Sequence, residues 1–215
     1  MDFQTERELK FSLTDEPPEE EALRLGLEAE GFSLGVERVE MHYDLYFDTR
    51  RGHLQRAGLA LRQRMIDDAA PLATLKAAGT AQGALHVRDE LELPLEGEAW
   101  PREIRMKVAE VAPLISLQPI LALATERTRY LVGRLNNLGG EEVAELSFDS
   151  VEATRQGGEV SVHFSELEIE ARRANADLER IAGILDGLLA LTPSGVNKLE
   201  RSLALLSLGT WDLEA

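Results

Sequence analysis

The sequence contains no cysteine and no apolar run long enough to cross a bilayer. The absence of cysteine excludes a disulfide framework and makes the cytoplasm the expected location. The N-terminus also lacks a basic stretch followed by an apolar one, so neither secretion nor membrane insertion is expected.

Basic and aromatic residues are both scarce. Lysine and arginine number 23 against 39 acidic residues, which gives a formal charge of −16 and argues against a nucleic-acid-binding surface. Any polyanionic ligand must therefore meet local positive charge or a metal ion. Aromatic residues make up 5% of the chain and offer little for stacking on a nucleobase.

The remaining composition is sufficient for a folded core. The chain has 215 residues, of which 44% are hydrophobic. We expect a single domain over residues 1–215 with C-terminal helices from about 176 to 208, and earlier helices over 22–29 and 101–111. An Asn- and Gly-rich stretch, residues 136–140, predicts a turn.

The first predicted strand, Phe3–Leu13, carries charge on alternate residues. Glu6, Glu8 and Lys10 share one face because successive side chains of a strand point to opposite sides. The opposite face is mostly apolar. Taken alone, this strand has either a solvent-exposed charged face or one wall of a polar cavity.

The same alternation recurs on at least six predicted strands, and the charges are sorted by sign. The charged positions are Arg62 and Arg64 within 58–65, Lys76 within 72–77, Arg88 and Glu90 within 85–95, Arg127 and Arg129 within 126–132, Asp149 within 141–151, and Glu166, Glu168 and Glu170 within 160–171. A solvated surface normally mixes the signs of its charges. The sorting therefore favours a shared polar interior over independent exposed faces.

A closed barrel explains this sorting physically. Like charges at neighbouring positions on one face repel by ~0.5 kcal/mol per exposed pair unless a partner compensates. In a closed antiparallel barrel the charged faces line the lumen, the apolar faces pack outward against helices, and no strand edge is left unpaired. We therefore predict an α+β fold built on such a barrel.

Seven short motifs follow one another along the chain. They are Glu6-x-Glu8-x-Lys10, Tyr46-Phe47-Asp48-Thr49, Leu61-Arg62-Gln63-Arg64, Thr74-Leu75-Lys76, Gly83-Ala84-Leu85-His86-x-Arg88-x-Glu90, Glu166-Leu167-Glu168 and Lys198-x-x-Arg201. In this order they resemble the CYTH superfamily, the triphosphate tunnel metalloenzymes, over about residues 3 to 206. The fifth motif makes the chain most similar to bacterial inorganic triphosphatases.

The resemblance implies an eight-stranded antiparallel β-barrel, the triphosphate tunnel, with helices packed outside. It also implies a divalent cofactor, Mg²⁺ or Mn²⁺. The carboxylates expected to hold this metal are Glu6, Glu8, Asp149, Glu166, Glu168 and Glu170, and which two of the last three ligate it is left open. The cations expected to bind substrate are Lys10, Arg62, Arg64, Lys76, Arg88, Arg127, Arg129, Lys198 and Arg201, with Glu90 as a further tunnel residue.

The implied reaction is hydrolysis of inorganic triphosphate to pyrophosphate and phosphate by in-line attack of water. Arginine forks and lysine ammonium groups suit phosphate oxygens, and carboxylates suit Mg²⁺. Catalysis is then electrostatic, with Arg62 and Lys76 among the catalytic residues and no covalent phosphoenzyme. Glu168 or Glu170 is the general base of this hypothesis, because a crowded acidic cluster raises a carboxylate pKa.

Simpler interpretations exist for several single residues. Arg88 could pair with Glu90 or Glu92 along its own strand, and His86 could lie at the tunnel mouth without a catalytic role. Lys198 and Arg201 lie one helical turn apart and could extend along the protein surface. The basic residues of the helix over 101–111 are expected to be solvated.

Other functions remain compatible with the same tunnel. Another triphosphate-processing activity would be that of a thiamine triphosphatase, a nucleoside triphosphatase, an RNA triphosphatase or a class IV adenylate cyclase. A non-catalytic polyphosphate-binding module is an alternative of a different class. Many bacterial relatives continue into a CHAD domain, so the chain is expected to be either a stand-alone protein or a truncated one, and a homodimer is left open.

Overall fold

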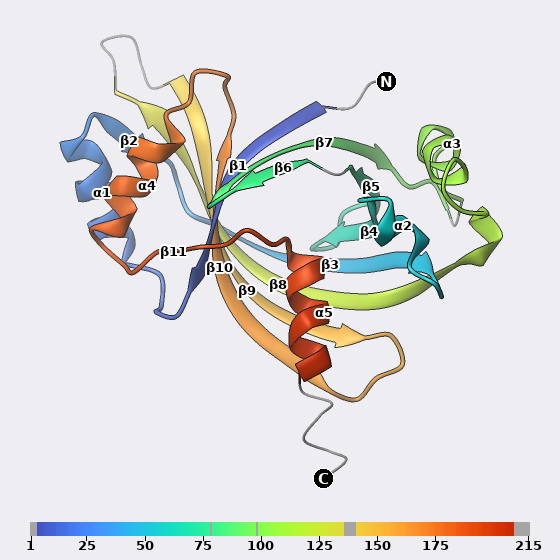
Figure 1. Cartoon of the computed structure of the whole chain (residues 1–215). Coiled ribbons are helices and arrows are strands. Elements are labelled where there is room, and N and C mark those ends of the chain that lie inside the picture. The colour runs from blue at the N-terminus through green and yellow to red at the C-terminus, as the bar shows by residue number, and fades with distance from the viewer. Residues whose placement is uncertain (1–3, 78, 98, 136–140, 209–215) are drawn as a thin grey trace.

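The computed structural model describes residues 4–77, 79–97, 99–135 and 141–208 (Figure 1). Within these residues, eight antiparallel strands pair in a closed ring. In the order of pairing they are β1 (Gln4–Leu13), β10 (Ser161–Ala171), β9 (Glu141–Arg155), β8 (Leu117–Arg134), β3 (Arg38–Thr49), β4 (Ala60–Ile66), β5 (Leu72–Lys76) and β7 (Leu85–Pro94). The predicted closed barrel is confirmed.

Strand β1 closes the ring because its two halves pair on opposite sides. Residues Gln4 to Leu9 pair with β7, and residues Glu8 to Leu13 pair with β10. This register places Glu6 opposite Arg88 and Lys10 opposite Glu168, on the inner face of the barrel. The charged face of the first strand is therefore part of a barrel wall.

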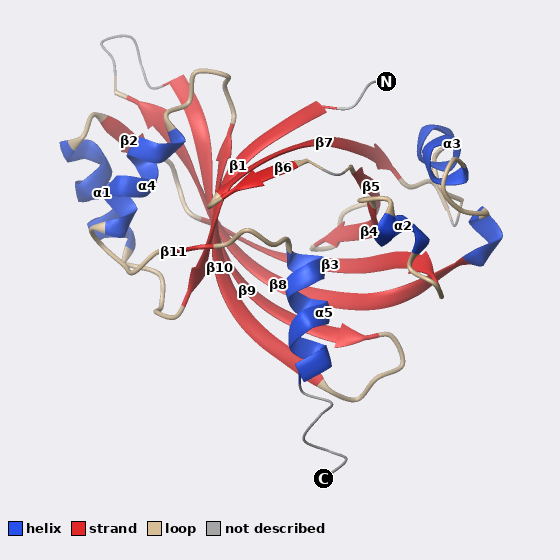
Figure 2. Cartoon of the chain, viewed as in Figure 1, coloured by secondary structure: helices blue, strands red, loops and turns tan. Residues whose placement is uncertain are grey.

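Two apolar clusters lie outside the barrel and are covered by helices (Figure 2). Helices α1 (Glu20–Ala29) and α4 (Leu178–Asp186) cover the outer face of β1, β9 and β10, where Leu146, Leu167 and Ile169 are fully buried. Helix α3 (Arg102–Ala109) covers the outer face of β5 and β7 on the other side of the barrel. This arrangement confirms that the apolar strand faces pack outward.

Helix α3 presents only two residues to this core. Ile104 and Val108 are buried, whereas its basic residues, Arg102, Arg105 and Lys107, are exposed as predicted. Beside it, the ring of Phe47 packs edge-on against Trp100 at a centroid distance of 5.0 Å.

A third apolar cluster lies on the inner face at one end of the barrel, where helix α5 (Lys198–Leu208) covers it. Leu199 and Leu206 of α5 pack with Leu121 and Leu123 of β8 and with Val151 of β9. Helix α5 lies across the concave side of the sheet (Figure 1). Its apolar side chains pack against the inner face of β8 and β9 at this end of the barrel. Its first residue, Lys198, is directed toward the charged interior.

The observed elements differ from the predicted ones mainly in length and in short additions. Strand β8 begins at Leu117, nine residues before the predicted start at Glu126, and α4 ends at Asp186. The elements that the sequence did not predict are β2 (Phe32–Leu34), α2 (His53–Arg56), β6 (Thr80–Gln82), η1 (Leu114–Ser116) and β11 (Thr192–Pro193). The turn predicted at residues 136–140 lies outside the described residues. Among the described helices, none has the length and apolar character needed to span a membrane.

Asp48 organises the connection between β3 and β4. Its Oδ1 accepts hydrogen bonds from the amides of Thr49 (2.6 Å) and Leu54 (2.9 Å), and its Oδ2 accepts one from Gln55 (3.0 Å). The residue is only 3% exposed. One carboxylate therefore satisfies backbone donors at the start of α2 that would otherwise be buried without a partner.

We expect Asp48→Ala to lower the free energy of unfolding by about 2 to 3 kcal/mol, because buried amide donors lose their acceptor. Asp48→Asn keeps the Oδ1 acceptor and should lose roughly half as much. Asp186→Ala, which removes an exposed carboxylate that accepts one amide hydrogen bond, is the matched control. Urea unfolding measures all three variants, and an Asp48→Ala loss no larger than the control would contradict this account of the connection.

Candidate active site

The barrel encloses a polar cavity of about 1040 Å³. Among the described residues that line it, nine are basic and six are acidic. The predicted site residues on this lining are Glu6, Lys10, Arg62, Arg64, Lys76, Arg88, Glu90, Arg127, Glu168, Glu170 and Lys198. Because the lining comes from strands all around the barrel and from α5, the sorted charges of separate strands converge in one chamber.

Arg88 joins the two carboxylates of the first strand. Its Nε donates to Glu6 Oε2 and its Nη2 donates to Glu8 Oε1, both at 2.7 Å. Lys76 reaches the same Glu6 at 3.1 Å and pairs with Glu90 at 2.9 Å. The alternative pairing of Arg88 along its own strand is therefore wrong, because β7 lies next to β1 in the closed ring.

Glu168 lies at the centre of a second group of charges. Its Oε1 accepts from Lys10 Nζ at 2.6 Å and from Lys198 Nζ at 2.7 Å, and its Oε2 accepts from Arg127 Nη2 at 2.5 Å. Burial acts to raise the pKa of Glu168, but these three cations outweigh it and hold the pKa well below its ordinary value. The predicted raised pKa is therefore wrong for Glu168.

Glu170 lies two residues after Glu168 on β10 and has the opposite electrostatic environment. Burial, reinforced by the carboxylates of Glu6 and Glu145, raises its pKa to about 7. Within the described chain, its carboxylate makes no hydrogen bond or ion pair with another side chain. Of the two predicted general-base candidates, Glu170 is the one whose oxygens are free to accept from a bound molecule.

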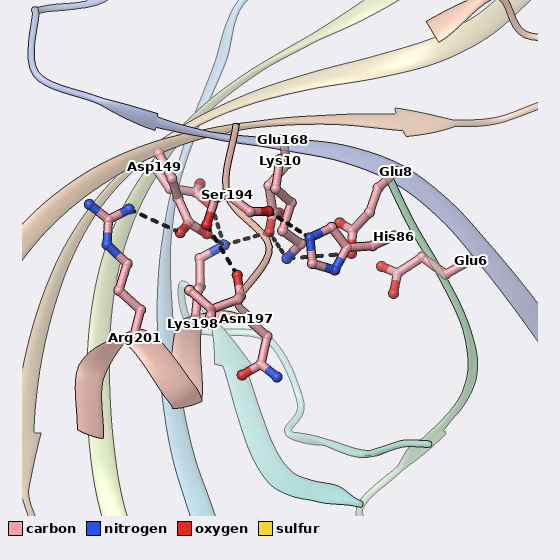
Figure 3. A network of polar contacts seen from close by, with 12 residues as sticks. Glu6, Glu8, Lys10, His86, Asp149, Glu168, Ser194, Asn197, Lys198 and Arg201 are labelled. Atoms are coloured by element: carbon pink, nitrogen blue, oxygen red, sulfur yellow. Dashed lines mark hydrogen bonds and ion pairs between the residues drawn. The ribbon is translucent and has the colours of Figure 1, made fainter. Parts of the chain in front are cut away.

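Asp149, Glu166 and Glu168 form an acidic triad whose ligand atoms lie within 4.8 Å of one another. Figure 3 shows the Lys198 side chain extending from α5 toward Asp149 and Glu168. Its Nζ lies 2.8 Å from Asp149 Oδ2, 2.5 Å from Glu166 Oε1 and 2.7 Å from Glu168 Oε1. The Lys198 ammonium group is thus already surrounded by three carboxylate oxygens. Because these are hard oxygen donors, the triad also fits a divalent metal such as Mg²⁺.

Asp149 is additionally held by Arg127. The guanidinium donates to both carboxylate oxygens, at 2.7 and 2.6 Å. Burial acts to raise the pKa of Asp149, but Arg127 and Lys198 lower it overall. Asp149 is therefore fixed in orientation by Arg127 and Lys198. Glu6 and Glu8 lie outside the triad, paired with Arg88.

The arginines of β4 are paired with a carboxylate that the sequence did not single out. Arg64 donates to both oxygens of Asp44, at 2.7 and 2.6 Å, whereas Arg62 lies 3.5 Å from Asp44 and 3.9 Å from Glu90. Asp44 shares a face with Tyr46 on β3, directly opposite Arg64. The alternation of β3 was the signal that could have identified it.

Two predicted substrate-binding cations are not on the cavity lining. Arg129 pairs with Glu40 at 2.7 Å and with Glu145 at 3.1 Å. Arg201 stacks over the ring of Phe164 with its Cζ at 4.4 Å from the centroid, and its Nη1 lies 3.7 Å from Glu166. Arg129 therefore links β8 to β3 and β9, whereas Arg201 holds α5 against β10 beside the triad.

His86 is buried and its ring contacts the backbone of the segment before α5. Its Nε2 lies 2.8 Å from the carbonyl oxygen of Ser194, to which it donates. The amide of Ser194 donates in turn to the carbonyl of Lys10 at 3.0 Å. His86 thereby fixes the segment that leads into α5.

Comparisons with known proteins agree with this fold. A CYTH domain family model matches residues 4–203. A search of curated protein sequences found no match. Among solved structures, a Hippeastrum protein for which a dominant triphosphatase activity is described has a TM-score of 0.61 at 20% identity, covering 93% of this chain and 95% of that one.

Two further structures are similar in fold. A Bacillus halodurans protein has a TM-score of 0.54 at 17% identity, covering 94% of this chain and 98% of that one. The PH1819 protein of Pyrococcus horikoshii has a TM-score of 0.53 at 17% identity, covering 94% and 99%. Since the family model spans nearly the whole barrel and reaches into α5, the chain belongs to the CYTH domain family.

Proposed function

We propose that this chain hydrolyses inorganic triphosphate to pyrophosphate and phosphate with the help of Mg²⁺ or Mn²⁺. The observation that carries the proposal is the gathering of cations in the cavity. The chain as a whole has a formal charge of −16, yet nine basic residues lie among the described residues that line the chamber. Guanidinium and ammonium groups brought together from separate elements inside an acidic protein are suited to a ligand with several negative charges.

Arg62 is the cation with the most free binding capacity. It is 6% exposed, its two ion pairs are 3.5 Å or longer, and within the described chain its Nε–H has no hydrogen-bond partner. A buried donor without a partner costs free energy that an anionic ligand recovers. Phosphate oxygens suit the planar guanidinium donors.

The lining also favours a phosphate chain without an attached ring system. Among the described lining residues, Tyr46 is the single aromatic one, and its ring is buried against Leu121. The chamber therefore offers no exposed ring on which a nucleobase could stack. The Hippeastrum protein of similar fold, described by its dominant triphosphatase activity, supports a triphosphate as the class of substrate.

The residues of the chamber have separable roles in this mechanism. Lys10, Arg62, Lys76, Arg88 and Arg127 hold the phosphate chain and neutralise charge that develops on the terminal phosphoryl group. When bound to the acidic triad, a divalent metal supplies further charge neutralisation and orients an oxygen ligand. Glu170 of β10, whose oxygens are free and whose pKa is raised to about 7, orients the attacking water and accepts its proton. The bond to the bridging oxygen breaks, and pyrophosphate leaves.

The proposed activity can be measured directly. Purified protein should release phosphate from inorganic triphosphate in the presence of Mg²⁺ or Mn²⁺, and a chelator should abolish the release. Parallel reactions with ATP and thiamine triphosphate, analysed for phosphate and for cyclic nucleotide, serve as comparisons. Tight triphosphate binding without turnover on any substrate would make the chain a binding module, and cyclic nucleotide formation would make it a cyclase.

Arg62→Ala should weaken substrate binding with little effect on folding, because Arg62 makes only long ion pairs with the protein. We expect KM for triphosphate to rise by about tenfold or more. Arg62→Lys keeps the charge but not the planar fork and should recover part of the loss. Arg102→Ala, on the exposed side of α3, is the control. A large drop in thermal stability of ligand-free Arg62→Ala would instead show that this arginine is structural.

Glu170→Gln should lower kcat by about 100-fold, the loss typical of a missing general base, with a smaller effect on KM. Glu168→Gln is the informative comparison, because Glu168 touches three cations and belongs to the triad. It should weaken metal activation as well as turnover. Steady-state kinetics over a range of Mg²⁺ concentrations separates the loss of turnover from the loss of metal activation. Wild-type turnover by Glu170→Gln would remove this residue from the mechanism.

A further inference from the structure

Lys198 occupies the centre of the acidic triad. It is the first residue of α5 and is 6% exposed. Its ammonium nitrogen contacts one oxygen from each of Asp149, Glu166 and Glu168, at 2.5 to 2.8 Å. No other cation of the described chain contacts all three carboxylates.

The same three carboxylates are the ones that come close enough together to hold a metal ion. A divalent cation such as Mg²⁺ binds carboxylate oxygens at roughly 2.0 to 2.1 Å and needs the space between them. An ammonium group that already contacts these oxygens fills that space. The lysine and a metal ion bound by the triad therefore exclude each other.

The position of Lys198 is fixed by the segment that precedes it. Ser194 is held between the carbonyl of Lys10 and the ring of His86, through hydrogen bonds of 3.0 and 2.8 Å. The first turn of α5 is closed reciprocally: the amide of Glu200 donates to Asn197 Oδ1, and the amide of Asn197 donates to Glu200 Oε2. The start of the helix is thus anchored to the barrel wall, which leaves the lysine side chain as the part that can move.

We propose that Lys198 competes with the divalent metal for Asp149, Glu166 and Glu168, so that the metal binds tightly only when a phosphate chain draws the lysine away. This inference rests on the proposed function, because the phosphate chain is the proposed substrate. It makes binding of metal and of substrate mutually dependent. In the free protein, Lys198 offsets the charge of these three buried carboxylates together with Arg127 and Lys10, without any bound ion.

Removal of the Lys198 charge distinguishes competition with the metal from two other roles that this lysine could have. A lysine that only binds phosphate would leave the affinity of the free protein for metal unchanged when removed. A lysine that only relieves repulsion among the carboxylates would, on removal, loosen the triad and weaken metal binding. Competition alone predicts that the affinity for metal increases.

The test measures Mn²⁺ binding in the absence of any phosphate compound, by the electron paramagnetic resonance signal of free Mn²⁺. The proteins compared are wild type, Lys198→Met, Lys76→Met and Lys198→Met combined with Asp149→Asn. Lys76→Met removes a cavity charge whose partners are Glu6 and Glu90, and so measures the general effect of a lost positive charge. The double variant removes one oxygen ligand of the triad.

Lys198→Met should lower the dissociation constant for Mn²⁺ by about tenfold or more, because the triad loses its internal cation. Lys76→Met should change it by less than about threefold, and Asp149→Asn should abolish the gain. Unchanged or weaker Mn²⁺ binding by folded Lys198→Met, or an equal gain in Lys76→Met, overturns the proposal. The measurement involves no triphosphate, so its failure is distinct from failure of the phosphate-release assay.

A second measurement applies if Lys198→Met does not fold. Wild-type protein is acetylated briefly with acetic anhydride, with and without saturating Mn²⁺, and modification of Lys198 is read by peptide mass spectrometry. Mn²⁺ should raise the modification of Lys198 several-fold and leave exposed Lys107 unchanged. Equal modification of Lys198 with and without bound Mn²⁺ overturns the proposal.

Discussion

Three cations converge on the Glu168 carboxylate, and the arrangement of the barrel interior depends on this convergence. Lys10 comes from β1, Arg127 from β8 and Lys198 from α5, at 2.5 to 2.7 Å. An unpaired buried charge costs several kcal/mol, so each of these groups is stable only while the others stay in place. The three elements are far apart in the sequence, and their common partner on β10 fixes them around one chamber.

The same pairing prepares the chamber for its proposed ligands. Arg62 lacks a close partner, Glu170 lacks a cation, and Lys198 fills the acidic triad. A phosphate chain and a divalent metal could bind by exchanging partners within this network, so that no charge is left buried alone. The outer apolar clusters beneath α1, α3 and α4 are independent of these exchanges, which allows the interior charges to rearrange without loss of the barrel.

Period-two alternation predicted most of this structure, because each strand has one face toward helices and one toward the lumen. The convergence of Glu6, Lys10, Arg62, Lys76, Arg127 and Glu168 was therefore predictable. Lys198 lies on a helix, and the family resemblance alone indicated that it reaches the tunnel. The ion-pair partners of the interior residues could not be predicted in this way. Arg88 contacts Glu6 because β1 pairs with β7, and no local sequence pattern shows that pairing. The opposite pKa shifts of Glu168 and Glu170 likewise depend on which charges the closed ring places beside each carboxylate. The short elements β6 and β11 are too brief for any periodicity to show.

A crystal structure of the protein with inorganic triphosphate and Mn²⁺ tests the central claim most directly, because anomalous scattering locates the metal independently of the phosphates. We predict phosphate groups inside the barrel against Arg62, and Mn²⁺ on Asp149, Glu166 and Glu168. We also predict that the Lys198 ammonium moves from these carboxylates to a phosphate oxygen. Triphosphate bound outside the barrel, or Mn²⁺ bound away from the triad while Lys198 keeps its three contacts, would contradict this claim.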